Sequence, residues 1–280
     1  MGKIYRSATS NVDNTILRTD LALEFGADIK SDFKDDFVKQ TAVRVDEEFS
    51  QKIGKPVGNY ITVETKVVRE GDKENFYRVS EALSKVIKKL ANLKDVLIVG
   101  LGNPDMTADS LGKRVLDKVM ITRHLETPKK MPKTSGIYPN VLGVTGIESF
   151  DVIKGVVSRT KPKCILAIDS LAGATVERVG SAFQISDAGI TPGSGISNHR
   201  TRLDEKSMGR PVISIGVPLV VYASTIIHDA YNGKPEEYCA SIGNMVVTPK
   251  DIDLLVTDCA SIIASAINLA YFDTNFDGMI

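Results

Sequence analysis

The stretch Asp95-Val-Leu-Ile-Val-Gly-Leu-Gly-Asn103 decides the fold class of this 280-residue chain. Its apolar run has no polar alternation, and Lys163-Cys-Ile-Leu-Ala-Ile-Asp169-Ser-Leu-Ala172 repeats the pattern. Such short apolar runs are typical of strands that are buried on both faces, as in α/β sheets. The two stretches therefore predict an α/β fold with a mostly parallel sheet.

The segments around these strands show the apolar spacing of helices or of further strands. Helices are expected at 74–93, 107–119, 147–157, from about Leu219, and at 251–270, and strands at 37–46, 59–68 and 212–217. No linker-like stretch divides them. We therefore expect one three-layer sandwich, a mostly parallel twisted sheet flanked by helices. Residues 1 to about 36 are polar and poorly periodic, which indicates a flexible or removable arm.

The composition argues against several classes of partner. Lys+Arg and Asp+Glu are equal at 35 each, so no overall charge favours direct binding to nucleic acid or to a membrane. The longest uncharged stretch, 212–227, is interrupted by Gly216 and Pro218 and is shorter than the roughly 20 apolar residues that span a bilayer. The three cysteines and the absence of an apolar leader at the N-terminus favour a reducing cytoplasm.

Two aspartates are the candidate catalytic residues. Asp169 ends one predicted strand, and Asp109 follows the other, in the expected first turn of the next helix. Open α/β sheets carry their chemistry beyond the carboxyl ends of the strands, so both carboxylates are expected in one crevice. A carboxylate pair suits acid/base hydrolysis. Each aspartate also has a purely structural explanation. Asp109 can be an acid in the first turn of a helix, and Asp169 can cap a loop. On the residues alone, these structural roles are as reasonable as the catalytic one.

Other motifs give no cofactor or metal site. The Gly100-Leu-Gly102 turn lacks the third glycine of a dinucleotide fingerprint, because Asp105 stands in its place. His124, His199 and His228 are scattered, and neither they nor the cysteines have the spacing of metal ligands.

One alternative resemblance concerns the bacterial peptidyl-tRNA hydrolases. Residues 98–104 resemble the opening of those enzymes, and Thr122-Arg-His124 resembles their histidine motif, although Leu125 replaces the expected asparagine. An esterase of that type is therefore kept as an alternative function.

A set of longer motifs follows in order along the chain. They are Arg18-Thr-Asp-Leu-Ala22, Val99-Gly-Leu-Gly-Asn103, Asp109-Ser-Leu-Gly112, Thr122-Arg-His-Leu125, Gly143-Val-Thr-Gly-Ile-Glu148, Ala167-Ile-Asp-Ser-Leu-Ala172, Gln184-Ile-Ser-Asp-Ala-Gly-Ile-Thr-Pro-Gly-Ser-Gly195, Gly216-Val-Pro218 and Thr248-Pro-Lys250. This ordered set resembles the germination protease family of spore-forming bacteria, from residue 18 to about residue 270.

The resemblance implies an endopeptidase that starts the degradation of small acid-soluble spore proteins in the cytoplasm of the spore core. It implies a homotetramer, a fold like that of hydrogenase maturation proteases, and Asp109 and Asp169 as the catalytic pair. No metal is expected. A metal-dependent maturation protease of the same fold is a separate alternative, and a catalytically silent binding domain is another. Which aspartate holds the proton is left open.

The resemblance also implies a zymogen that removes its own N-terminus. The family position places the cut between Asp20 and Leu21, giving a propeptide, 1–20, and a single peptidase domain, 21–280. A second candidate is the Glu24–Phe25 bond, because Glu-Phe-Gly resembles the cleavage sites of spore proteins.

The chain also departs from the family pattern. It is shorter between Gly233 and Thr248, and Leu219 and Tyr222 stand where threonine and aspartate are expected. These departures bear on substrate preference and on contacts between subunits.

Overall fold

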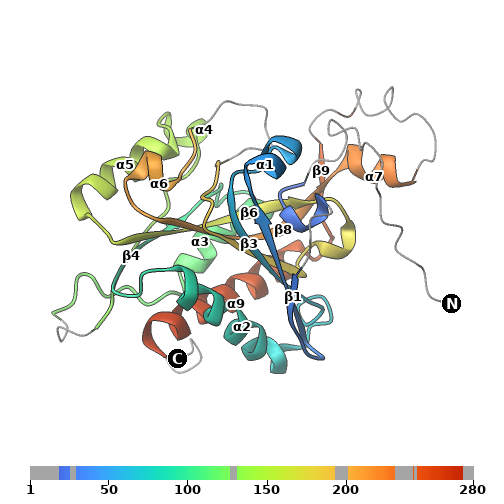
Figure 1. The fold of residues 1–280 in the computed structure, drawn as a ribbon, viewed down its shortest axis with the longest axis horizontal. Helices are drawn as coiled ribbons and strands as arrows, with labels where there is room; N and C mark the ends of the chain where they lie inside the picture. The colour runs from blue at the N-terminus through green and yellow to red at the C-terminus, as the bar shows by residue number, and fades with distance from the viewer. Residues whose placement is uncertain are drawn as a thin grey trace.

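The computed structural model describes residues 19–25, 30–126, 131–192, 201–230, 242 and 245–273, with the backbone alone at 30–34 and 228–230. Within these residues the fold is a nine-stranded sheet in the order β1-β2-β3-β7-β8-β6-β4-β5, with β9 beside β8 (Figure 1). The strands are β1 (Lys30–Lys34), β2 (Val38–Val45), β3 (Gly58–Thr65), β4 (Asp95–Gly100), β5 (Lys133–Ile137), β6 (Cys164–Gly173), β7 (Ala182–Ser186), β8 (Val212–Tyr222) and β9 (Val246–Val247). The α-helices are α1 (Glu47–Ile53), α2 (Phe76–Leu90), α3 (Leu111–Leu116), α4 (Leu142–Thr145), α5 (Ser149–Thr160), α6 (Glu205–Met208), α7 (Ala223–Ala230) and α9 (Ile252–Phe272). Short 3-10 helices are η1 (Ala22–Phe25), η2 (Lys73–Asn75), η3 (Thr107–Asp109) and η4 (Val176–Arg178).

The sheet confirms the predicted fold class, and its two halves differ in direction. Strands β8, β6, β4 and β5 run parallel. Strands β1, β2, β3, β7 and β8 pair antiparallel. Parallel neighbours need long crossover connections, which α3 and then α4 and α5 provide around β5. The connection from β1 to β2 is instead a tight turn, held by Asp35 Oδ1, which accepts the Phe37 and Val38 N–H groups at 2.8 and 2.7 Å.

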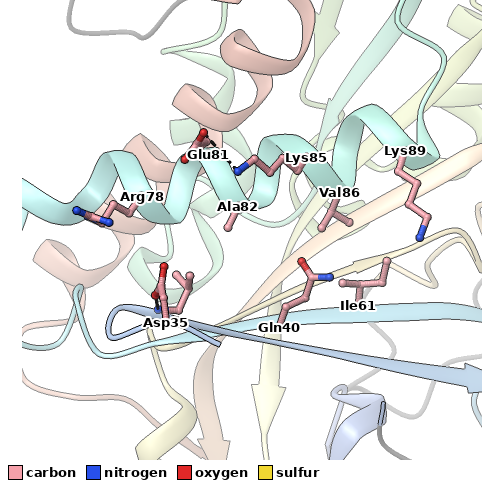
Figure 2. Close-up of a pocket in the computed structure, with 10 residues that line it drawn as sticks. Asp35, Gln40, Ile61, Arg78, Glu81, Ala82, Lys85, Val86 and Lys89 are labelled. Carbon is pink, nitrogen blue, oxygen red and sulfur yellow. Dashed lines mark hydrogen bonds and ion pairs between the residues drawn. The ribbon is translucent and has the colours of Figure 1, made fainter. Parts of the chain in front are cut away.

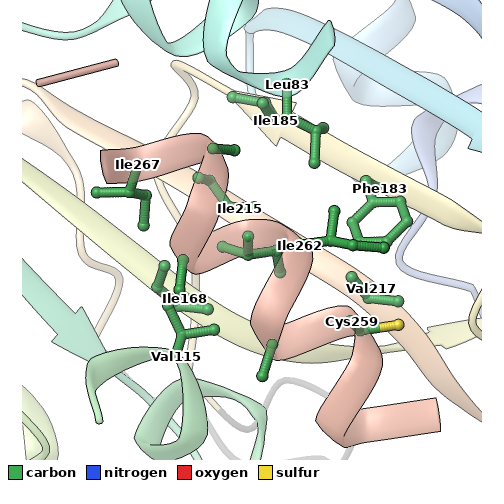
Figure 3. Packing of buried hydrophobic residues seen from close by; sticks show 14 of the residues in the cluster. Leu83, Val115, Ile168, Phe183, Ile185, Ile215, Val217, Cys259, Ile262 and Ile267 are labelled. Carbon is green, nitrogen blue, oxygen red and sulfur yellow. The ribbon is translucent and has the colours of Figure 1, made fainter. Parts of the chain in front are cut away.

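Helices α2, α3 and α9 cover one face of the sheet, and this interface holds the largest hydrophobic core (Figure 1). Figure 3 shows α9 lying along β6, β7 and β8, with Ile262 and Ile267 directed at the sheet. Helix α9 is long and apolar enough to cross a membrane, but 56% of that apolar stretch is buried inside the protein. Its place in the core accounts for its composition.

The opposite face of the sheet is covered in two parts. Helices α5 and α6 cover the part over β4 and β6, around Ile153 and Leu203. The N-terminal segment, residues 19–25, covers the part over β2, β3 and β7, together with the partly buried side of α1. Leu21 and Ala22 in this segment are fully buried.

The expectation of a flexible arm is therefore wrong for residues 19–25, and also for residues 30–34, which form β1. Only Thr19 and Asp20 of the expected propeptide belong to the described residues.

Two predicted helices also have different bounds. The helix expected at 107–119 consists of the turn η3 and the short helix α3, which ends at Leu116. The helix expected near Leu219 begins only at Ala223, because β8 continues to Tyr222 and pairs with β6 as far as Val221. Residues 217–222 are mainly β-branched or aromatic, which suits a buried strand.

Candidate functional site

Asp169 lies where the neighbouring strand β4 leaves the sheet. The last pair between β4 and β6 joins Gly100 to Ile168, whereas β6 remains paired with β8 as far as Gly173. Asp169 was predicted to end its strand, but it is an internal residue of β6 and the first one beyond the end of β4. Its side chain is 8% exposed. The carboxylate therefore sits at the carboxyl end of the parallel ladder while its backbone stays fixed by β8.

Asp109 is held by the glycine turn that follows β4. The Asn103 N–H donates to Asp109 Oδ2 at 2.8 Å. Gly102 has a φ of 94°, and a Cβ atom there would lie 2.2 Å from the Asp109 carbonyl oxygen and 2.7 Å from Oδ1. The close approach that glycine allows at position 102 is therefore used by Asp109.

Three carboxylates converge on this point of the sheet. Burial raises the pKa of Asp169 well above its ordinary value, and the nearby carboxylates of Asp109 and Asp20 raise it further. The Ser170 N–H, which donates to Asp169 Oδ1 at 3.0 Å, acts in the opposite direction. The structure thus brings together the two predicted catalytic aspartates, and it adds Asp20 from the predicted cleavage position.

Asp20 is bound to β6 three residues beyond Asp169. Its N–H donates to the Ala172 carbonyl at 2.9 Å, and the Ala172 N–H donates to Asp20 Oδ2 at 2.9 Å. Lys55 Nζ lies 3.6 Å from Asp20 Oδ1. The following residue, Leu21, packs in an apolar cluster that includes Leu171. Asp20 is therefore bound to the part of β6 that continues beyond the end of β4.

Glu24 anchors the other end of this segment. Its Oε2 accepts the Thr19 hydroxyl and, at 3.0 Å, the Ala174 N–H. Arg178 Nε lies 3.0 Å from Glu24 Oε1, and Arg178 NH1 donates to Glu64 at 2.9 Å. Burial raises the pKa of Glu24, while these partners lower it. The segment is thus held at both ends.

Sequence reasoning did not single out Lys55, Arg178 or Gln184 as residues of the site. Gln184 belongs to a family motif, but the other two carried no signal, because their contacts join residues far apart in the chain.

Comparison with known proteins identifies the family. The sequence model described as germination protease matches residues 14–233. The germination protease of Caldanaerobacter subterraneus subsp. tengcongensis is 39% identical in an alignment that covers 91% of this chain and 94% of that protein. The germination protease of Clostridium tetani is 36% identical, with 91% and 95% covered, and that of Bacillus cytotoxicus is 35% identical, with 82% and 83% covered. The chain belongs to the germination protease family. A protease role in spore germination follows from this membership.

The histidine motif has a structural explanation in this family member. Thr122 is buried and joined to Thr134 by hydrogen bonds, and Arg123 forms an ion pair with Asp95. His124 is exposed in the turn that follows. His199 and the side chain of His228 lie outside the described residues. Within the described part of the chain, no three His, Cys, Asp or Glu side chains form a group that could hold a metal ion.

A cavity of about 330 Å³ lies away from these carboxylates, between α2 and the strands β2 and β3. Figure 2 shows Arg78, Lys85 and Lys89 on α2 above Gln40 and Ile61 of the sheet. None of Asp20, Asp109 and Asp169 lines it, so the cavity does not belong to the carboxylate site.

The raised pKa of Asp169 predicts a stability effect. The folded chain binds this proton more tightly than the unfolded chain, whose aspartate titrates at its ordinary pKa of 3.8. The free energy of unfolding should therefore fall as the pH rises from that value through the raised pKa, by about 1.4 kcal/mol for each unit of elevation. Asp169→Asn removes this pH-dependent loss of stability, because asparagine does not ionise, and its side-chain oxygen can still accept the Ser170 N–H. Urea unfolding should find the variant more stable than the wild type at neutral pH and similar in acid.

The matched control is Asp105→Asn, at an exposed aspartate of the adjacent loop, which should show no such gain. An Asp169→Asn variant that is less stable than the wild type at every pH would contradict the prediction.

Proposed function

We propose that this chain is an endopeptidase that uses Asp109 and Asp169 as an acid/base pair and cuts its own chain between Asp20 and Leu21. One observation carries the proposal. The predicted cleavage segment is bound beside Asp169, and the Asp20 carboxylate is near enough to raise the pKa of Asp169.

The environments of the two aspartates favour different roles. A backbone N–H stabilises the Asp109 carboxylate, which suits a general base. Burial and like charges favour the protonated form of Asp169, which suits a general acid. Two carboxylates that share one proton in this way can activate water for attack on a peptide bond.

The proposed reaction needs no further reagent. Asp109 takes a proton from water as the water oxygen bonds to the carbonyl carbon of Asp20. Asp169 gives its proton to the Leu21 nitrogen, and the C–N bond breaks to leave a carboxyl group and an amine. The proton on Asp109 then passes to Asp169, which restores the starting pair.

The backbone conformation supports the Asp20–Leu21 bond over Glu24–Phe25. Asp20 lies outside the 3-10 helix η1, and its N–H donates to the Ala172 carbonyl of β6 at 2.9 Å. Glu24 and Phe25 lie in the 3-10 helix η1, and the Glu24 carboxylate is occupied by Arg178 and Ala174. These contacts favour the first bond as the substrate.

The cleavage position can be tested on the purified full chain. Incubation followed by mass spectrometry and N-terminal sequencing should give a product that begins at Leu21. A product that begins at Phe25 would favour the second position, and a fully active protein that keeps residues 1–20 would overturn the zymogen proposal.

The pH dependence of self-cleavage follows from the role of Asp169. The acid must hold its proton, so the cleavage rate should fall as the pH rises through the raised pKa of Asp169. Asp20→Asn removes one of the two carboxylates that raise this pKa, and the falling limb should then move to lower pH. Initial rates of the two proteins across the acid-to-neutral range check this. A limb that stays in place, or moves to higher pH, would contradict the assignment of Asp169 as the acid.

We further propose small acid-soluble spore proteins as substrates, a homotetrameric assembly and the cytoplasm of the spore core as the compartment. Incubating the processed protein with such a spore protein and, separately, with a peptidyl-tRNA distinguishes the peptidase from the esterase alternative. Light scattering of the same sample gives the number of subunits.

A further inference from the structure

One buried side chain binds the backbone on both sides of Leu21. Gln184 of β7 donates from Nε2 to the Asp20 carbonyl oxygen at 3.1 Å. Its Oε1 accepts the Ala22 N–H at 2.8 Å. Gln184 is 7% exposed, so both bonds lie inside the protein. Its amide therefore contacts the carbonyl of the peptide bond proposed to be cut.

Gln184 and Asp169 lie in one row across the sheet. Gly216 of β8 pairs with Asp169 on one side and with Gln184 on the other. Side chains in register on neighbouring strands point to the same face, so Asp169 and Gln184 both face the N-terminal segment. Gly216 has no side chain, and a Cβ there would lie 2.5 Å from Leu171. The Leu171 side chain therefore fills the space over Gly216, in the row between the two polar side chains.

We propose that Gln184 is a further catalytic residue, which stabilises the negative charge that develops on the carbonyl oxygen before the scissile bond. This inference rests on the proposed cleavage between Asp20 and Leu21. As water adds to the carbonyl carbon, its oxygen gains charge, and a prepositioned amide N–H about 2.7–3.1 Å away stabilises that oxygen. Collapse of the intermediate returns the electrons to the carbonyl as the C–N bond breaks. The amide donates a hydrogen bond throughout and transfers no proton.

The second bond of Gln184 fixes the register of the peptide. Because the same side chain holds the Ala22 N–H, it selects which carbonyl of the segment meets Nε2. Because Gln184 donates the hydrogen bond to the carbonyl oxygen, the proton of Asp169 remains available for the leaving amine. A neutral amide does not titrate, so its contribution should not depend on pH, unlike that of Asp169.

The test compares self-cleavage rates of the full-length chain. Gln184→Met keeps the size of the side chain without a donor, and Gln184→Glu keeps an acceptor for the Ala22 N–H. Both should slow cleavage between Asp20 and Leu21 by about 10²–10³-fold. The falling pH limb set by Asp169 should stay in place in Gln184→Met, because methionine carries no charge. Gln40→Glu, at a half-buried position of β2 remote from the carboxylates, is the matched control and should cleave like the wild type.

Docking of the segment is measured separately, in an Asp169→Asn background that blocks cleavage. Hydrogen exchange at the Ala22 amide should remain protected in Gln184→Glu. A wild-type cleavage rate in Gln184→Glu with Asp169 intact would overturn the inference. So would loss of that protection in step with the rate, because Gln184 would then act only by docking the segment. Failure of the wild type to cut after Asp20 would instead refute the proposed function itself.

Discussion

Asp109→Asn and Asp169→Asn should each abolish self-cleavage and substrate cleavage while the protein still folds. Asparagine matches aspartate in shape but can neither take a proton from water nor give one to the leaving amine. Loss of one general acid or base costs about 10²–10⁴-fold in rate. Because the two groups act as one proton-sharing unit, the double variant should be hardly slower than either single variant.

The measurement is the rate of appearance of the chain that begins at Leu21, together with cleavage of an added spore protein. Asp105→Asn provides the control, because its exposed carboxylate lies in the same loop as Asp109 but outside the pair. Retained self-cleavage in either purified single variant would refute the two-aspartate mechanism.

Gly102→Ala should remove activity through the position of Asp109 rather than through its chemistry. The added methyl group would lie 2.2 Å from the Asp109 carbonyl oxygen, and the φ of 94° is unfavourable for alanine. Backbone strain of this kind costs about 1–3 kcal/mol, and the clash must also move η3 away from the glycine turn. We expect a lower free energy of unfolding and cleavage reduced as strongly as in Asp109→Asn.

Gly155→Ala is the matched control, since Gly155 lies within α5 with open space around its Cβ position. That substitution should raise the free energy of unfolding by about 0.5–1 kcal/mol and leave cleavage unchanged. Urea unfolding and cleavage rates measured on both variants test whether Gly102 is needed to position Asp109. A fully active Gly102→Ala protein would show that the turn does not position Asp109.

The sequence predicted the elements whose pattern is local. The strands β4 and β6 are buried on both faces, so their apolar runs identify them without knowledge of their neighbours. Helix α9 was predicted at 251–270 and spans Ile252–Phe272, because apolar residues recur along its length. The ordered motifs pointed to the germination protease family, and the comparisons confirm this.

The site was predicted only in part, since the position of the N-terminal segment depends on contacts between residues that are far apart in the chain. Asp109 follows the predictable strand β4 and Asp169 lies on the predictable strand β6, so their meeting near the carboxyl end of β4 could be expected. The polar N-terminal segment gave no sign of burial, because Glu24 and Gln184 bind partners about 150 and 160 residues away.

What the sequence by itself determined is the α/β class, the family and the candidate aspartate pair, because these rest on local patterns of burial and on motifs. The tertiary structure alone decided that β6 continues past Asp169, since that extension depends on pairing with β8. It also decided that residues 19–25 lie over β2, β3 and β7 with Asp20 bound to the end of β6, and that Gln184 holds the backbone on both sides of Leu21. Hydrogen bonds between segments so far apart follow from strand order and register, which no local pattern encodes.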